Sequence, residues 1–232
     1  MLAVRDLQSG YEDIQVLQGI SLEVREGELV ALFGPNGHGK STLLKAISGV
    51  HQATSGAVLY QGRDITRLPA HRIVREGIAY IAEERYLFPE MTVRENLRMG
   101  AYNRQARNEM GRNLELVYEV FPALKDRERQ LCITLSGGEG RMVAIARGLM
   151  SGASLLLVDE PSIGLAPSLK NNLYAAIRRI NTEGGVTILL VEQEIEHALE
   201  MAVRFYVLKK GQILLERPAA EAEPGEIKEA YF

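Results

Sequence analysis

The fold expected for this chain is decided by nine residues, Gly34-Pro35-Asn36-Gly37-His38-Gly39-Lys40-Ser41-Thr42. They match the pattern G-x-x-x-x-G-K-[ST]. The apolar run Leu29–Phe33 precedes them, and a stretch from Leu43 to Ile47 whose apolar residues share one helical face follows them. Glycines let backbone N–H groups curl around phosphates, and a helix start adds its dipole and its free donors. We therefore predict a phosphate-binding loop between a buried strand and a helix.

Two side chains of this loop carry the expected chemistry. Lys40 supplies a point charge for the β- and γ-phosphates of a nucleotide, and the Ser41 hydroxyl can bind Mg²⁺. A glycine turn with a chance Lys-Ser pair is the plainer alternative. A dinucleotide-binding loop fits less well, because Thr42 stands where a third glycine is needed. His38 either touches a phosphate or, as we favour, lines the loop without a catalytic role.

A pair of acids follows the apolar run Leu155–Val158. In open α/β sheets, ligands bind at the carboxyl ends of the strands, which is where Asp159 and Glu160 are expected. Asp159 is predicted to bind Mg²⁺ directly or through water, and Glu160 to polarise an attacking water as a general base. An apolar strand that ends in acids is common, so this prediction depends on the phosphate loop.

The composition is that of a globular chain and excludes several classes of protein. The 232 residues carry a formal charge of −3, with 46% hydrophobic and 25% charged residues, which excludes disorder, collagen and coiled coil. The longest apolar runs fall far short of the roughly 18 residues of a membrane span. Arg5 and Asp6 interrupt the N-terminus, so no signal peptide is expected. Cys132 is the single cysteine, which fits a reducing, cytoplasmic location without an internal disulfide.

Strands alternate with helices along the chain, which predicts a parallel sheet with crossover helices. Residues 1–33 are predicted as strands, residues 91–150 as a mostly helical insertion with a stripe from Met110 to Phe121, and Lys210-Gly211 as the centre of a hairpin. Further strands are expected at Val58–Tyr60, Ile78–Ile81, Leu155–Val158 and Val186–Val191. Further helices are expected at Pro69–Glu76, Leu169–Ile180 and Ile195–Met201, and a solvated connector at Ala219–Gly225 before a last short helix.

A second candidate anion site is the segment Leu135-Ser136-Gly137-Gly138-Glu139, which precedes a helix with Met142 and Leu149 on one face. A serine hydroxyl and two glycine N–H groups at a helix start can bind an anion. An ordinary N-cap is the alternative. The residues alone leave open which phosphate such a pocket would contact.

The phosphate loop, Leu135–Glu139 and Leu155–Glu160, in this order along the chain, resemble the motifs of the ATP-binding cassette (ABC) family, and the resemblance covers essentially the whole chain. It implies an α/β fold: a P-loop NTPase core whose mixed sheet is flanked by helices, with an N-terminal antiparallel β part and an inserted helical subdomain. Residues 1–90 and 151–232 would form the ATP-binding core, and residues 91–150 the helical subdomain with the signature motif. In that family two cassettes pair head to tail around two ATP molecules.

The resemblance also assigns residues to the nucleotide. It implies that Ser136, Gly137 and Gly138, with Glu139 beside them, contact the γ-phosphate of the ATP held by the other subunit. Tyr11 stands before Val16-Leu17, as the family's adenine-stacking aromatic does, although a strand-edge aromatic is the alternative.

Four segments are similar to one branch of the family, the ATPase subunits of branched-chain amino acid importers and their relatives for urea and short amides. They are Asp13–Leu17, Pro161–Pro167, Ile188–Gln193 and the ending Glu229–Tyr231.

Three positions depart from the usual cassette pattern. Glu83 stands where most cassettes have a glutamine, and it either binds Mg²⁺ or is a solvated loop acid. Gln193 aligns with the usual histidine; it can donate a hydrogen bond to a γ-phosphate but cannot take up a proton. Gly140 should weaken the first turn of the helix after the signature by up to about 1 kcal/mol. His197 lies one turn beyond Gln193 and is expected on the helix surface.

The resemblance implies an ATPase subunit that closes as a dimer on two ATP–Mg²⁺ and drives separate membrane-spanning permease subunits. These would dock near Glu83 and the segment Met91–Tyr102, at the inner face of the cell membrane, with a solute-binding protein as an indirect partner. The second cassette would be identical or homologous. A soluble cassette that acts on DNA or ribosomes is a weaker alternative, since the chain is slightly acidic and no nucleic-acid partner is expected. A regulatory cassette with impaired hydrolysis is the third.

Overall fold

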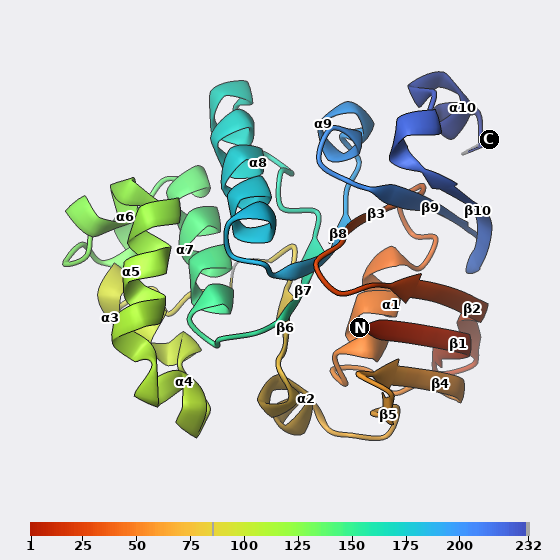
Figure 1. The fold of residues 1–232 in the computed structure, drawn as a ribbon, viewed down its shortest axis with the longest axis horizontal. Coiled ribbons are helices and arrows are strands. Elements are labelled where there is room, and N and C mark those ends of the chain that lie inside the picture. The colour runs from red at the N-terminus through yellow and green to blue at the C-terminus, as the bar shows by residue number, and fades with distance from the viewer. Residues whose placement is uncertain (85, 231–232) are drawn as a thin grey trace.

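Residues 1–84 and 86–230 are described by a computed structural model, and their strands form one six-stranded and one four-stranded sheet (Figure 1). The six-stranded sheet has the order β10-β9-β3-β8-β7-β6, with only β10 antiparallel to its neighbour. Its strands are β3 (Leu29–Phe33), β6 (Ile78–Ile81), β7 (Leu155–Asp159), β8 (Thr187–Val191), β9 (Arg204–Lys209) and β10 (Gln212–Pro218). Every residue of β3, β7 and β8 is buried, which explains why these segments are apolar without alternation.

The four-stranded sheet is antiparallel and contains the strands predicted at Val58–Tyr60 and in residues 1–33, except for Leu29–Phe33, which is β3 of the other sheet. Its order is β2-β1-β4-β5, with β1 (Leu2–Tyr11), β2 (Ile14–Val24), β4 (Ser55–Tyr60) and β5 (Arg63–Asp64). The inner face of this sheet shares a hydrophobic cluster with α1 (Lys40–Ile47) and with Val30 and Leu32 of β3. The antiparallel sheet and the phosphate loop are therefore held together by one core.

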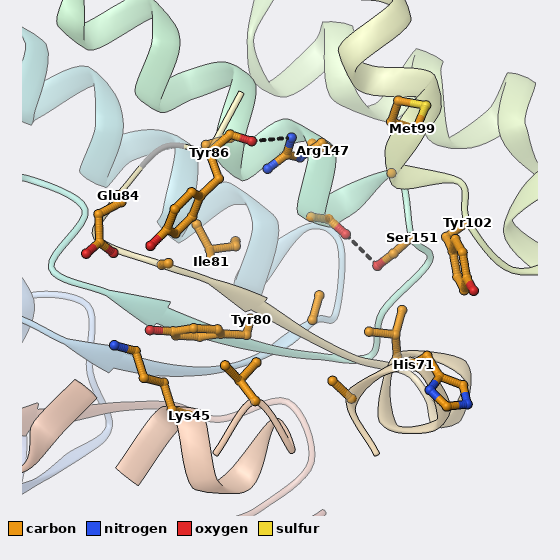
Figure 2. A pocket seen from close by; sticks show the side chains of 18 of the residues that line it. Lys45, His71, Tyr80, Ile81, Glu84, Tyr86, Met99, Tyr102, Arg147 and Ser151 are labelled. Atoms are coloured by element: carbon orange, nitrogen blue, oxygen red, sulfur yellow. Dashed lines mark hydrogen bonds between the residues drawn. The ribbon is translucent and has the colours of Figure 1, made fainter. Parts of the chain in front are cut away.

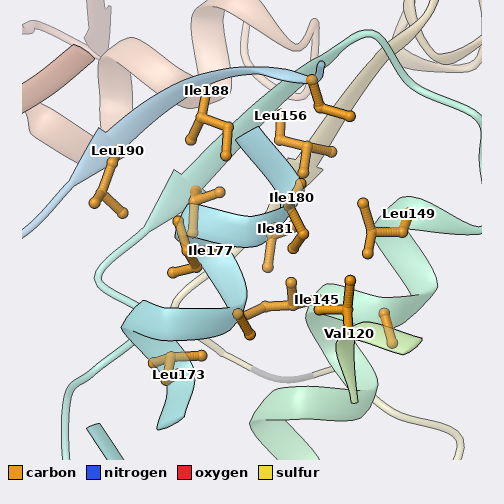
Figure 3. Close-up of a cluster of buried hydrophobic side chains, with 14 of the residues drawn as sticks. Ile81, Val120, Ile145, Leu149, Leu156, Leu173, Ile177, Ile180, Ile188 and Leu190 are labelled. Carbon is orange, nitrogen blue, oxygen red and sulfur yellow. The ribbon is translucent and has the colours of Figure 1, made fainter. Parts of the chain in front are cut away.

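Helices cover the opposite face of the six-stranded sheet (Figure 1). They include α8 (Pro167–Thr182), α9 (Ile195–Leu199) and α10 (Pro224–Glu229). Figure 3 shows Ile177 and Ile180 of α8 packed with Leu156 and Ile188 of the sheet in the larger hydrophobic cluster. The predicted helix at Leu169–Ile180 is confirmed and is longer at both ends.

Between β6 and β7, the described residues form helices, turns and one isolated bridge. The elements are α3 (Val93–Gly100), α4 (Arg104–Asn108), α5 (Met110–Val120), α6 (Pro122–Asp126), a 3-10 turn at Cys132–Thr134 and α7 (Gly137–Leu149). The predicted helical character is confirmed, with one correction. The stripe from Met110 does not continue as helix through Phe121, because Pro122 begins α6 there. Val93 and Leu97 belong to the same hydrophobic cluster as Leu156 of the sheet. The helical segment therefore shares the hydrophobic core of the six-stranded sheet.

The remaining elements follow the predictions with small differences. Helix α2 (Ala70–Glu76) is confirmed, and the predicted helix at Ile195–Met201 ends two residues early. The predicted connector Ala219–Gly225 is partly wrong, because a 3-10 turn at Ala219–Glu221 and the start of α10 at Pro224 lie within it.

Lys210 and Gly211 join β9 to β10 with φ of 48° and 76°, as a two-residue hairpin requires. Tyr231 of the C-terminal segment lies outside the described residues.

Candidate active site

The phosphate loop lies between the end of β3 and the start of α1, as predicted. Two glycines fix its shape. A Cβ at Gly34 would lie 2.1 Å from the carbonyl oxygen of Leu208, and a Cβ at Gly39 would lie 2.9 Å from a methyl group of Leu17. Gly39 also has a φ of 108° at the position just before the helix, a conformation that side chains other than glycine avoid. The loop therefore lies against both sheets.

Lys40 lies at the centre of the loop and is almost completely buried. Its ammonium group donates to the carbonyl oxygens of Gly34 at 2.7 Å and Pro35 at 3.1 Å. It also lies 3.2 Å from a carboxylate oxygen of Glu160, whose side chain is 8% exposed. A buried charge of either sign is stable only with such a partner. The structure thus brings the predicted phosphate-binding lysine and the predicted general base into direct contact.

Asp159 is held at the end of β7 by two hydroxyl groups. Ser41 donates to Oδ1 at 3.2 Å, and Tyr80 donates to Oδ2 at 2.9 Å. Burial raises the pKa of Asp159, although these hydrogen bonds act in the opposite direction. Ser41 and Asp159, the two residues predicted to bind Mg²⁺ from the phosphate loop and the acidic pair, thus lie side by side, whereas Tyr80 was not singled out from the sequence.

The residues around Asp159 fit a magnesium ion that keeps several non-protein ligands. Ser41 and Asp159 offer hard oxygen donors side by side. In the part of the chain that the structure describes, there is no group of three or more His, Cys, Asp and Glu residues arranged to hold a metal. Mg²⁺ is usually bound by one or two protein oxygens together with water and phosphate, which is the donor set available here.

Gln193 follows β8 and connects the phosphate loop to the acid. Its side-chain amide donates to a carboxylate oxygen of Glu160 and, at 3.0 Å, to the side-chain oxygen of Asn36. Glu160 itself has a φ of 42°, a left-handed conformation that is strained for residues other than glycine and often found at functional sites. The structure thus places Gln193 between the loop residue Asn36 and the carboxylate of Glu160.

A buried acid that the sequence analysis left without a role fixes this region. Glu192 is 1% exposed and accepts hydrogen bonds from the hydroxyl of Ser162 at 3.0 Å and from the backbone of Gln193 at 2.8 Å. It thereby holds the backbone of Gln193 and the segment just after Glu160. Its place at the end of an apolar strand is the signal that also identified Asp159.

One cavity of about 450 Å³ joins the predicted residues. It brings Tyr11 of the antiparallel sheet together with the phosphate loop, Glu83 and Glu160. The lining residues are Tyr11, Val16, Asn36, Gly37, Gly39, Lys40, Ser41, Thr42, Glu83, Glu160 and Ile163. Glu83 thus lies in the wall of the cavity that holds the phosphate loop.

Two histidines lie beside this cavity without lining it. The ring of His51 stacks on Tyr11 with 4.3 Å between the ring centroids, and its Nε2 lies 2.7 Å from the carbonyl oxygen of Gly10. The sequence analysis did not single out His51. The Nδ1 of His38 accepts from the backbone of Lys210 at 3.3 Å, which agrees with the favoured, non-catalytic reading of His38.

The signature segment, Leu135–Glu139, lies at the start of α7 and outside this cavity. Ser136 and Glu139 form a reciprocal cap: the Ser136 backbone donates to the Glu139 carboxylate at 2.8 Å, and the Glu139 backbone donates to the Ser136 hydroxyl at 3.4 Å. Hydrogen bonds from Ser136, together with Arg127 at 2.7 Å, lower the pKa of Glu139. Helix α7 continues through Gly140, which is buried. A single chain therefore does not bring this segment to its own phosphate loop.

Comparison with known proteins identifies the family. The model of the family described as ABC transporter matches residues 17–163. The chain belongs to the ABC transporter family. The high-affinity branched-chain amino acid transport ATP-binding protein BraG of Pseudomonas aeruginosa is 42% identical, over 100% of this chain and 99% of BraG. A probable branched-chain amino acid transport ATP-binding protein, LivF of Archaeoglobus fulgidus, is 35% identical over 95% of this chain and 93% of LivF.

Solved structures agree with this cassette assignment. A nucleotide-free ATP-binding cassette from an ABC transporter superposes with a TM-score of 0.86 at 25% identity, covering 100% of this ABC cassette and 98% of that chain. A cassette in its ADP conformation gives a TM-score of 0.83 at 27% identity, covering 100% and 94%. The expected family, α/β fold class and ATPase activity are thereby confirmed. No helix among the described residues is both long and apolar enough to span a bilayer.

Proposed function

We propose that this cassette is the ATP-hydrolysing subunit of an importer for branched-chain amino acids. ATP hydrolysis is supported by the buried contact between Lys40 and Glu160 and by the hydrogen bond from Gln193 to the same carboxylate. The names of BraG and LivF, matched over nearly the whole chain, support the transported class. An importer for urea or short amides is the alternative substrate assignment.

The roles of the residues follow from where they lie. The Lys40 ammonium, next to the glycine-rich backbone, would neutralise the β- and γ-phosphates of ATP. Ser41 and Asp159 would hold Mg²⁺, and Glu83 lines the same cavity as Ser41. Bound there, the ion would neutralise charge that develops on the phosphate oxygens. The loop from Gly34 to Thr42 would surround the phosphates, and Tyr11 would stack on the adenine.

Hydrolysis requires a base and a group that orients the water. The Glu160 carboxylate would accept the proton of the attacking water, and its release from Lys40 would free it to do so. The Gln193 amide would donate to the γ-phosphate in place of a histidine. Retention of Lys40, Asp159 and Glu160 favours this function over that of a regulatory cassette without hydrolysis.

A second copy of the cassette would complete each site. Ser136, Gly137 and Gly138 lie at the start of α7 and outside the cavity of their own chain. In a head-to-tail dimer they would approach the γ-phosphate of the other subunit. The carboxylate of Glu139 is used in the helix cap, so it would support this segment by fixing Ser136.

Membrane permease subunits would dock into a second, larger cavity. This groove has a volume of about 660 Å³ and lies between α1, α2, β6, α3 and α7 (Figure 2). It exposes Tyr86, Phe88, Met99 and Tyr102, which are 42–68% exposed. Exposed apolar side chains around one groove indicate a protein interface. A permease segment in this groove would hold the cassette at the inner face of the membrane, and the permease would connect it to a solute-binding protein.

The proposal is tested by reconstitution. The cassette, co-produced with the permease subunits encoded beside it, is placed in vesicles, and ATP-dependent uptake of leucine, isoleucine and valine is measured against urea and acetamide. The Glu160→Gln variant is the matched control for ATP-driven uptake. Uptake of urea or acetamide without uptake of the amino acids would contradict the substrate assignment. A wild-type cassette without ATP hydrolysis would contradict the enzymatic one.

A further inference from the structure

Tyr80 lines the groove assigned to the permease and bonds to Asp159, which in turn is bonded to Ser41 of the nucleotide cavity. It lies in β6, which pairs in parallel with β7, the strand that ends at Asp159. Its hydroxyl donates to Oδ2 of Asp159 at 2.9 Å, and Ser41 donates to Oδ1 at 3.2 Å. Each oxygen of the carboxylate therefore has its own hydroxyl donor, and one of these belongs to the phosphate loop.

The same tyrosine lines the groove assigned to the permease. Figure 2 shows the Tyr80 ring among the groove residues, above Lys45 in that view. The side chain thus has its ring at the groove and its hydroxyl at the metal-binding carboxylate. An aromatic ring is rigid, so displacement of its groove side also moves the hydroxyl.

We propose that Tyr80 is a positioning residue that transmits occupation of the groove to the metal-binding carboxylate of Asp159. The inference rests on the proposed function, because it takes the groove as the permease site and Asp159 as a Mg²⁺ ligand. With Tyr80 in place, Oδ2 is held and Oδ1 points to Ser41. A groove occupant that shifts the ring removes the donor from Oδ2, and the carboxylate is then free to rotate away from Ser41.

The first test removes only the hydroxyl. Tyr80→Phe retains the ring in the groove, and binding of a fluorescent N-methylanthraniloyl ATP is titrated with Mg²⁺. We expect the half-saturating Mg²⁺ concentration to rise about three- to tenfold, the effect of losing one hydrogen bond. Nucleotide affinity without Mg²⁺ should not change. An unchanged Mg²⁺ requirement would overturn the inference.

Tyr60→Phe is the matched control. Tyr60 is 2% exposed, and its hydroxyl bonds to the Ser154 hydroxyl at 2.8 Å, remote from Asp159. Its loss should lower the melting temperature without changing the Mg²⁺ requirement. If Tyr60→Phe and Tyr80→Phe shift the Mg²⁺ requirement equally, the effect of Tyr80 is general destabilisation and the inference is wrong.

The second test fills the groove with a defined occupant. Cys132, the single cysteine, is buried, so Met99→Cys provides one exposed thiol in the groove wall for N-benzylmaleimide. We expect labelling to change the half-saturating Mg²⁺ concentration when Tyr80 is present and to have no further effect in Tyr80→Phe. Labelling of Leu214→Cys, on exposed β10 outside the groove, should have no effect in either background.

The outcomes separate the inference from the proposed function. Equal effects of the Met99→Cys label with and without the Tyr80 hydroxyl would show that another route connects the groove to the metal. No effect of the label in either background would overturn the inference as well. A wild-type chain whose nucleotide binding does not respond to Mg²⁺ would instead contradict the proposed function, and the inference would fail with it.

Discussion

The ammonium group of Lys40 lies 3.2 Å from the carboxylate of Glu160, and both side chains are less than a tenth exposed. Each charge compensates the other in a place where neither is solvated. Phosphate at the loop would compete with Glu160 for the lysine. In the proposed mechanism, the same lysine would restrain the base and release it once the lysine binds phosphate.

Glu160→Gln should abolish hydrolysis while retaining ATP. The amide cannot accept a proton, so we expect turnover to fall at least about 100-fold. With the competing carboxylate gone, Lys40 binds phosphate more strongly, and an ATP-bound dimer should accumulate. Light scattering after gel filtration with ATP and Mg²⁺ measures it. A variant that stays monomeric in excess ATP and Mg²⁺ would contradict the shared-site mechanism.

Lys40→Ala should lose both nucleotide affinity and stability. The substitution leaves the buried Glu160 without its cation, which costs about 3–5 kcal/mol in comparable buried pairs. The double variant Lys40→Ala, Glu160→Gln removes the unpaired charge and should recover much of this stability without recovering ATP binding. Chemical denaturation and nucleotide titration separate the two effects. Normal ATP affinity in either variant would rule out the role of Lys40.

Gln193 predicts a particular pH dependence. Glutamine does not titrate, so ATPase activity should show no protonation step from this position. In Gln193→His, a histidine beside Glu160 and Asn36 should add a step near its ordinary pKa of about 6.5. Comparison of the two pH profiles of kcat tests this, because steps from other groups are common to both. Identical profiles in two active proteins would place Gln193 outside the reaction.

Tyr11→Ala should weaken binding of the base and leave binding of the phosphates intact. Base stacking on an aromatic ring contributes about 1–3 kcal/mol, so ATP affinity should fall about 5- to 150-fold while affinity for inorganic tripolyphosphate is unchanged. The His51 ring stacks on the Tyr11 ring, with 4.3 Å between the centroids. His51→Ala should therefore also lower ATP affinity, but by less than Tyr11→Ala. Equal losses for ATP and tripolyphosphate would mean that the loop itself is disturbed.

The two reciprocal caps of the helical segment provide a matched pair of variants. Thr92 and Glu95 cap α3 in the same manner as Ser136 and Glu139 cap α7. Ser136→Ala and Thr92→Ala should each cost about 1 kcal/mol of stability. Only Ser136→Ala should also weaken the ATP-dependent dimer, assayed in the Glu160→Gln background. If the Ser136→Ala and Thr92→Ala variants dimerise equally well with ATP, Ser136 has only a capping role.

Much of the fold could be predicted from local patterns. The phosphate loop has a motif of fixed spacing, the strands β3, β7 and β8 are short apolar runs, and α8 has apolar residues on one helical face. Boundaries such as the break at Phe121 and Pro122 were missed, because an apolar stripe can continue across two consecutive helices. The connection of the helical segment to the main core was also not visible, since composition does not reveal packing partners.

The site residues that were missed act through contacts distant in sequence. Tyr80 reaches Asp159 across two neighbouring strands, and His51 reaches Tyr11 from the chain after α1. Neither belongs to a spaced motif. Glu192 was visible as an acid after a buried strand, but the hydrogen bonds that it accepts from Ser162, Gln193 and Glu194 were not. Sequence motifs identify the residues that would contact a ligand. The residues that position those side chains become visible only through tertiary contacts.

The strand order has a consequence for synthesis on the ribosome. β3, which leads into the phosphate loop, has only β8 and β9 as neighbours in its sheet, and both are encoded more than 150 residues later. Until residues 187–209 leave the exit tunnel, this fully apolar strand has no place in the sheet. Pairing over such a separation is slow and exposes apolar segments meanwhile. Completion of the nucleotide site should therefore be among the last events in biogenesis, and nascent chains that stop before Thr187 should depend on chaperones.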